Sequence, residues 1–235
     1  MKYTKRIKLL FKSIRINYIF CITYFILILF ISYKYGNNSN GIVNFCNAYI
    51  TLMVSFVFGW LIHYFSHNYK YTKEYKKTYI YKYLKKKCKW LNNAILHILS
   101  KQFEFHDKVH HDSSVNKTIT NLITEFIQNI IVVSILFILL NNACNLNYNN
   151  LIILSYGFWY AITHNISYSL THNPFHKQHH KNKFTNYGID FVDILFGTKY
   201  NSTVEDMNIH SSNIIISGLI IVFIKEYNLL PFLYL

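Results

Sequence analysis

Residues 17–33 read NYIFCITYFILILFISY, and this stretch contains no charged side chain. A helix needs about 20 mostly apolar residues to cross a bilayer, with a lower limit near 17, so the stretch predicts a membrane-spanning helix. A basic segment precedes it and no convincing small-x-small cleavage site follows, a pattern typical of an uncleaved signal anchor. The basic residues are Lys2, Lys5, Arg6, Lys8, Lys12 and Arg15.

Further apolar stretches follow toward the C-terminus. Residues 41–65 predict a second span. A long charge-free run comes later, and the polar residues 141–150 divide it, so we expect a helical hairpin formed by residues 120–140 and 151–167. Residues 213–224 are short for a span and are expected to lie along the bilayer or dip into it. The predicted fold class is therefore all-α, a polytopic membrane protein with about four transmembrane helices.

The charge of the chain is unusual for its hydrophobicity. The sequence has 24 Lys and Arg against 10 Asp and Glu, although 52% of its residues are hydrophobic. A nucleic-acid-binding protein would be more polar, so no nucleic-acid partner is expected. In a four-span arrangement residues 1–16, 69–116 and 177–199 carry the basic residues to one side, which the positive-inside rule makes cytoplasmic.

This arrangement also predicts the domain organisation. Residues 1–16 form a basic cytoplasmic N-terminus, and residues 17–235 form a single membrane domain with a histidine-rich helical cap on the cytoplasmic side. In a eukaryotic cell we expect this domain in the membrane of the endoplasmic reticulum.

Histidine outnumbers the carboxylates, with 12 residues against 10. Ten of the 12 fall into three groups that the predicted topology brings to one depth at the cytoplasmic face. Spacings of three or four residues place several of these imidazoles on common helical faces. The groups are His63 and His67; His106, His110 and His111; and His164, His172, His176, His179 and His180.

These groups together predict a histidine-rich metal site. Neutral imidazole is the commonest metal ligand, and so many convergent donors suit two first-row metals better than one. A structural zinc takes four ligands and would leave most of the histidines unexplained. Histidines satisfied independently in a core would have no reason to share one depth. His97 is expected to have no part in the metal site. His210 either supports a ligand or has no role, and we favour the second interpretation.

The motifs around the last group resemble those of the fatty acid hydroxylase/sterol desaturase superfamily. The box His176-Lys-Gln-His-His180 is followed by Asn186-Tyr-Gly188 and then by Asp193-Ile-Leu-Phe-Gly-Thr198. The family has an HxxHH box, an NYG-type turn and a W-D-x-x-F-G-T segment in this order, and Val192 stands where the family usually has Trp. His164 looks like the family's lone histidine at the end of the last span. The resemblance covers about residues 58–200.

The middle histidine group departs from the HxxHH box of the family. Asp107 stands three positions before His110, and His106 stands one position earlier. Either His106 is a ligand from a locally shifted helix, or Asp107 replaces it as an oxygen ligand. His172 matches no clear family position, so its role as a ligand stays open.

The resemblance implies a non-haem di-iron oxidoreductase. Two Fe ions and dioxygen would hydroxylate or desaturate a membrane lipid, such as a fatty acyl chain or a sterol, while the protein fixes the ligand geometry. Electrons would come from an external donor, such as a cytochrome b5-type protein. No catalytic residue beyond the metal ligands is expected. The carboxylates that could orient an imidazole through its second ring nitrogen are Asp107, Asp112, Glu125 and Asp193.

Other functions compete with this one. A zinc hydrolase is disfavoured because no HExxH motif occurs in the sequence. A metal transporter is disfavoured because its ligands would lie near the bilayer midplane. The remaining alternative is a non-catalytic or metal-binding membrane protein that retains the hydroxylase fold, which the irregular middle group would fit.

Overall fold

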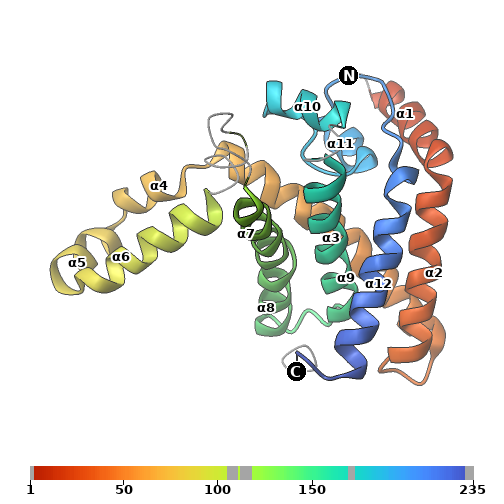
Figure 1. Cartoon of the computed structure of the whole chain (residues 1–235), viewed down its shortest axis with the longest axis horizontal. Coiled ribbons are helices and arrows are strands. Elements are labelled where there is room, and N and C mark those ends of the chain that lie inside the picture. Colours follow the sequence, from red (N-terminus) through yellow and green to blue (C-terminus); the bar gives the residue numbers. More distant parts are fainter. Residues whose placement is uncertain (1–2, 105–110, 112–117, 169–172, 231–235) are drawn as a thin grey trace.

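The computed structural model describes residues 3–104, 111, 118–168 and 173–230, and all regular elements in these residues are helices (Figure 1). The α-helices are α1 (Tyr3–Ile16), α2 (Tyr18–Tyr35), α3 (Gly41–Asn68), α4 (Tyr71–Lys77), α5 (Tyr79–Lys87), α6 (Lys89–Ile98), α7 (Ile119–Ile130), α8 (Leu136–Ala143), α9 (Asn150–Ile162), α10 (Pro174–Lys181), α11 (Asp190–Phe196) and α12 (Ser211–Glu226). Three π-helical turns, η1 (Leu99–Phe103), η3 (Ile131–Ile135) and η4 (Thr163–Tyr168), and the 3-10 turn η5 (Met207–His210) extend them.

Four helices are long and apolar enough to cross a membrane. They are α2, α3, the helix Ile119–Ala143 that α7, η3 and α8 form together, and the helix Met207–Glu226 that η5 and α12 form. The prediction of an all-α fold with about four membrane-spanning helices is confirmed, and it fits a multi-pass membrane protein. The fourth of these helices is Met207–Glu226, however, and the predicted span 151–167 is not among them. Residues 213–224, which are short for a span by themselves, belong to the longer helix Met207–Glu226, which is long and apolar enough to cross a membrane.

The predicted return helix of the hairpin, residues 151–167, lies in the middle of the bundle (Figure 1). It consists of α9 and the π turn η4 that continues it. Ten of the 13 residues of α9 are buried, and the helix packs against α12, α7 and α3. A helix that is apolar all round is expected to be buried rather than amphipathic. The other long helices are therefore arranged around α9.

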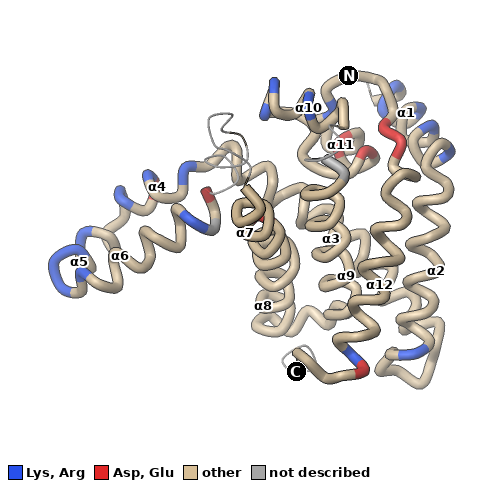
Figure 2. Tube along the Cα trace, in the orientation of Figure 1, with Lys and Arg blue, Asp and Glu red and all other residues tan. Residues whose placement is uncertain are grey.

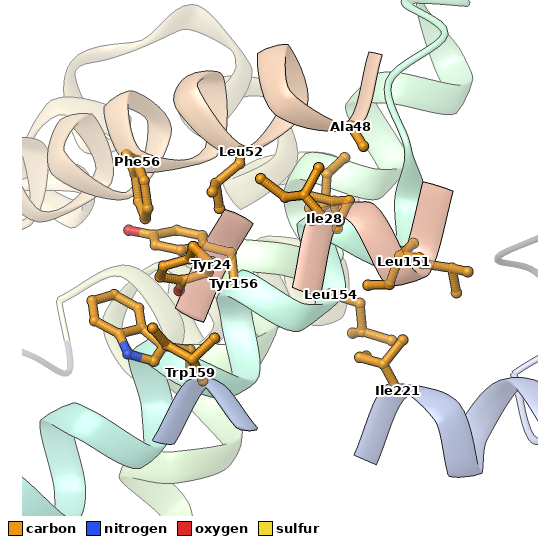
Figure 3. Close-up of a cluster of buried hydrophobic side chains, with 14 of the residues drawn as sticks. Tyr24, Ile28, Ala48, Leu52, Phe56, Leu151, Leu154, Tyr156, Trp159 and Ile221 are labelled. Carbon is orange, nitrogen blue, oxygen red and sulfur yellow. The ribbon is translucent and has the colours of Figure 1, made fainter. Parts of the chain in front are cut away.

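An aromatic core joins α2, α3 and α9 (Figure 3). Tyr24 packs edge-to-face on Phe56 with ring centroids 5.4 Å apart, and Phe20 packs on Trp159 at 5.6 Å. Gly59 permits a close approach, because a Cβ atom there would lie 2.1 Å from the hydroxyl of Tyr156. Aromatic side chains bury a large area each, so this core holds α2, α3 and α9 together. His63 and His67 lie beyond it, toward the end of α3.

Charged residues are distributed unevenly over the molecule (Figure 2). Lys and Arg gather on α1, on α10 and on the arm of helices α4 to α6, which projects sideways from the bundle (Figures 1 and 2). The opposite end of the bundle carries Lys34, Lys225 and Glu226, and Lys34 Nζ lies 2.6 Å from Glu226 Oε1. The lysine-rich segment predicted for one side of the membrane thus extends from the end of α3, which carries His63 and His67.

Candidate metal centre

Seven of the ten predicted histidine ligands lie in the described residues, and the structure brings all seven together at the end of α3. The ring centroids of neighbours within this histidine cluster lie between 4.2 and 5.1 Å apart. The cluster consists of His63 and His67 of α3, His111, His164 of η4, and His176, His179 and His180 of α10. The predicted ligands His106, His110 and His172, and the carboxylates Asp107 and Asp112, lie outside the described residues.

One half of the cluster offers four nitrogen ligands to a single position. His63, His67, His111 and His179 each present one ring nitrogen, and these four atoms all lie within 4.8 Å of one another. The Nε2 atoms of His63 and His179 are 3.1 Å apart. Metal–imidazole bonds of about 2.0–2.1 Å place two ligands of one ion about 2.8–3.4 Å apart at bond angles of about 90–110°, so this pair has the spacing of ligands that share an ion.

The other half contains a second pair with similar spacing. The Nε2 atoms of His176 and His180 are 2.9 Å apart, and the ring of His164 lies 5.0 Å from that of His176. His111 contacts both halves, because its ring stacks on His180 at 4.2 Å and lies 4.5 Å from His67. In the described residues a second pair of imidazoles therefore lies beside the group of four nitrogens.

A π-helical turn places His164 in the cluster. The α9 helix ends at Ile162, and η4 continues it with a wider turn from Thr163. The ring of His164 stacks on Tyr160 one turn earlier, with centroids 5.7 Å apart, and the side chain is buried. Single π turns are frequent at functional sites, since they change the direction of a side chain without ending the helix.

Glu125 contacts this histidine from α7. Its Oε1 atom lies 2.9 Å from His164 Nδ1, and both side chains are buried. A carboxylate in this position fixes the orientation of the imidazole and leaves Nε2 as the nitrogen that can bind a metal. Of the predicted orienting carboxylates in the described residues, Glu125 is thus the one that contacts an imidazole.

The residues at the start of the short helix α10 stabilise its first turn. The side-chain oxygen of Asn173 accepts hydrogen bonds from the backbone N–H of Phe175 at 2.8 Å and of His176 at 3.3 Å, and Pro174 occupies the first turn. Both features stabilise a helix start. The i, i+3, i+4 spacing then directs His176, His179 and His180 to one side of the helix.

A turn after α10 orients one pair of imidazoles through its backbone. His63 Nδ1 lies 2.6 Å from the carbonyl oxygen of Tyr187, and His179 Nδ1 lies 2.6 Å from that of Thr185. A carbonyl oxygen can only accept, so both Nδ1 atoms carry the proton. The neutral rings then present their Nε2 lone pairs to one another, which is the form that binds a metal.

Asp193 acts on this turn rather than on an imidazole. Its Oδ1 accepts hydrogen bonds from Tyr187 N at 2.9 Å and Thr198 Oγ1 at 2.6 Å, and its Oδ2 accepts one from Gly188 N at 2.9 Å. Burial raises the pKa of Asp193 to about 6, while these hydrogen bonds oppose the increase. The expectation of a direct contact with an imidazole is corrected: Asp193 holds the segment whose carbonyl groups orient His63 and His179.

Sequence reasoning missed the carbonyl groups of Thr185 and Tyr187. Backbone acceptors have no characteristic residue type, and the only signal was the NYG-type turn that includes Tyr187. The two histidines outside the three groups lie as follows: His97 is on α6 in the arm, and His210 is buried in η5 before α12.

Comparisons of the chain with protein-family models, with curated proteins and with solved structures found no match.

Proposed function

We propose that this chain is a membrane oxidoreductase that binds two iron ions in the histidine cluster and uses dioxygen to hydroxylate or desaturate a membrane lipid. One observation carries the proposal. Two pairs of ring nitrogens, His63 with His179 and His176 with His180, lie 3.1 and 2.9 Å apart within one cluster. Both distances suit two ligands of one ion, and two such pairs favour two ions.

The donor set fits this assignment. Imidazole suits iron, zinc and copper, whereas magnesium and calcium prefer oxygen ligands. The resemblance to the hydroxylase/desaturase motifs favours iron among the three. When bound, the ions would supply the activation of dioxygen and the transfer of electrons to it.

The chain's own residues hold and shield the site. The carbonyl groups of Thr185 and Tyr187 keep His179 and His63 in the Nδ1-protonated form, and Glu125 orients His164. His179 is fully buried, so bulk water is excluded from the centre of the cluster. This exclusion favours oxidation of an apolar C–H bond over side reactions with solvent.

The surroundings of His63 support a substrate from the bilayer. A cavity of about 40 Å³ lies between α3 and the helix Ile119–Ala143, and beside His63 its lining includes the apolar Ile62, Val132 and Val133 as well as the polar Glu125, Gln128 and Asn129. Such a volume exceeds the ~10–15 Å³ that one water molecule needs, so the cavity beside His63 is not completely filled by side chains. Since both helices are long and apolar enough to span a membrane, a lipid tail could approach the cluster from this side.

The reaction also requires a reductant. Hydroxylation consumes one dioxygen, two electrons and two protons, and it yields the alcohol and one water. The electrons would come from a separate one-electron carrier, such as a cytochrome b5-type protein, that docks on the basic side of the molecule (Figure 2). By the positive-inside rule this side would face the cytoplasm.

Metal analysis of the full-length protein in detergent tests the first half of the proposal. We expect about two iron ions per chain in the wild type and about one in the His179→Ala and His176→Ala variants, because each variant removes one ring nitrogen from one pair. His97→Ala, in the arm, is the matched control and should retain two ions. Loading below one ion per chain that neither cluster variant changes would contradict the metal site.

Lipid analysis tests the second half of the proposal, the oxidation of a membrane lipid. Cells that express the wild type with competent electron donors should accumulate hydroxylated or desaturated lipids, and cells with His180→Ala should not. His97→Ala again serves as the control. Two bound ions with an unchanged lipid profile would instead favour the alternative of a non-catalytic metal-binding membrane protein.

A further inference from the structure

Trp60 lies on α3 one turn before His63 and on the same face of the helix. Its indole is half-buried beneath the exposed ring of Phe196, which stacks on it with centroids 4.3 Å apart. Gly188 leaves room for the indole, since a Cβ atom there would lie 3.2 Å from Cδ1 of Trp60. Trp60 is therefore held against the turn that orients His63, and it is still close to the surface.

Tyr187 contacts both Trp60 and the histidine cluster. Its side chain is buried, and its ring meets that of Trp60 edge-to-face with centroids 6.2 Å apart. Tyr64 adds a parallel contact, because its ring centroid lies 5.3 Å from those of Trp60 and of Tyr187. On the other side, the ring of Tyr187 lies 5.7 to 6.0 Å from three of the four imidazoles that converge on one position, His63, His67 and His179. Rings of oxidisable side chains thus connect the cluster with Trp60.

The indole of Trp60 also has a route for its proton. Its Nε1–H donates a hydrogen bond to Thr198 Oγ1 at 3.1 Å, and the hydroxyl of Thr198 donates one to Asp193 Oδ1 at 2.6 Å. Burial raises the pKa of Asp193 to about 6, so its carboxylate is a better proton acceptor than that of an ordinary aspartate. An indole nitrogen can only donate, and its N–H becomes strongly acidic when the ring loses an electron. The link to Asp193 therefore lets Trp60 release an electron and a proton together.

The chain has two other tryptophans, which serve as comparisons. Trp159 is buried in the aromatic core, and its Nε1 has no hydrogen-bond acceptor among the described residues. Trp90 lies on α6 in the arm and is 73% exposed. Trp60 thus differs from Trp159 in its proton acceptor, and it differs from Trp90 in its contact with Tyr187.

We propose that Trp60 is an internal electron donor to the metal site and protects the histidine ligands when dioxygen reacts there without lipid. Trp60 gives one electron through Tyr187 to the centre that dioxygen has oxidised, and its Nε1 proton moves through Thr198 to Asp193. The centre is reduced by one electron, and a neutral Trp60 radical remains near the surface. A one-electron reductant such as a thiolate then restores the tryptophan, while the proton returns from Asp193. The inference rests on the proposed function, since it requires a redox-active metal in the cluster.

Oxidation of the iron-loaded protein tests the electron route. Full-length protein in detergent receives Fe²⁺ under anaerobic conditions, is analysed for bound iron, and is then mixed with dioxygen in the absence of lipid. Electron paramagnetic resonance of frozen samples detects the radical, and peptide mass spectrometry locates oxidised side chains. We expect a tryptophan radical and more oxidised product at Trp60 than at Trp90, although Trp90 is the more exposed.

Three variants identify the donor and the chain. Trp60→Phe should abolish the radical and increase the oxidation of His63 and His179. Tyr187→Phe interrupts the chain but keeps the backbone carbonyl group that orients His63, so iron loading should persist while oxidation of Trp60 falls. Trp90→Phe is the matched control and should change neither the radical nor the oxidation of the histidines.

Flash oxidation of the metal-free protein tests the proton route. A ruthenium(III) complex produced by a light flash oxidises tryptophan in the Trp90→Phe background, and visible absorption distinguishes the neutral radical from its protonated form. We expect rapid formation of the neutral radical with Thr198 and with Thr198→Ser, which keeps the hydroxyl group. Thr198→Val breaks the link to Asp193 and should delay the loss of the proton. Trp60→Phe should remove the signal.

Two results would overturn the inference. One is iron-loaded protein in which Trp90 is oxidised at least as much as Trp60 and Tyr187→Phe changes nothing. The other is an equal rate of proton loss with Thr198 and with Thr198→Val, a measurement that needs neither metal nor activity. Protein that binds no iron would contradict the proposed function and this inference with it, and the metal analysis of the same samples separates that case from the first.

Discussion

The Nε2 atoms of His63 and His179 lie 3.1 Å apart, although 116 positions separate the two residues in the sequence. The Nδ1 atom of each ring donates a hydrogen bond to a carbonyl group of one turn, so both unprotonated nitrogens face each other. Two lone pairs at this distance repel one another, and a cation between them turns the repulsion into two coordinate bonds. This pair is therefore the part of the cluster whose response to metal is simplest to predict.

Addition of metal should raise the thermal stability of metal-free protein, because an ion that binds only the folded state shifts the equilibrium toward it. At a free metal concentration of 100 times Kd the expected gain is about 2.7 kcal/mol for each ion bound. Thermal unfolding in detergent, with and without Fe²⁺ under anaerobic conditions, measures the gain. His63→Ala should remove about half of it and His97→Ala none, and a gain of equal size in both variants would argue against the site.

Asp193→Asn should lower the metal affinity without removing a ligand. The amide cannot accept all three hydrogen bonds that the carboxylate accepts from Tyr187, Gly188 and Thr198, so the turn loses its anchor. Loss of a group that supports metal ligands typically reduces affinity about 10–100-fold. A competition titration against a chelator measures this change.

Asp206→Asn is the control for that variant, since Asp206 is exposed and caps the short helix η5 instead. Equal affinities of Asp193→Asn and the wild type would show that the turn does not position the histidines.

Glu125→Gln should affect the second pair of imidazoles more than the first. The carboxylate forms a close contact with His164 Nδ1, and hydrogen bonds to charged groups are about twice as strong as those between neutral groups. We expect one ion to bind as in the wild type and the other to bind about 10–100-fold more weakly. Stepwise titration with a spectroscopic probe such as Co²⁺ resolves the two steps. Glu226→Gln, at the far end of the bundle, should leave both unchanged.

Gly59→Ala should destabilise the protein. The added Cβ atom would lie 2.1 Å from the hydroxyl of Tyr156, inside the aromatic core, and overpacking of a core typically costs about 1–3 kcal/mol. Gly41→Ala provides a matched control at the start of the same helix, because its Cβ atom would meet nothing within 4 Å. Chemical unfolding in mixed micelles compares the two variants, and similar midpoints would contradict the packing argument.

The contribution of Glu205 to the stability of the metal-free protein should fall as the pH rises from about 4.5 to about 7. Burial raises the pKa of Glu205 to about 7, so the folded state retains a proton that the unfolded state has already released. The contribution of this group is fully present below pH 4.5 and declines by at most about 1.4 kcal/mol per pH unit. Glu205→Gln should remove this part of the pH dependence. Unfolding curves of both proteins across this range give the difference, and parallel curves would exclude Glu205 as its source.

The sequence by itself determined the features that depend on a few neighbouring residues. Charge-free lengths predict α2, α3 and the helix Ile119–Ala143, and the i, i+4 spacing of His63 and His67 places both on one face of α3. These properties follow from the pitch of a helix and the thickness of a bilayer, so no tertiary contact is needed to deduce them.

Tertiary structure alone decided the packing of the helices and the contacts of the carboxylates. Packing on all sides makes α9 the central helix, and the start of the last span at Met207 depends on how the chain folds before α12. Among the carboxylates, Glu125 contacts an imidazole whereas Asp193 contacts a turn, although both residues carry the same chemical group. The physical reason is that these roles depend on distances between segments far apart in the sequence, and the carbonyl groups that orient His63 and His179 belong to the backbone, which every residue shares.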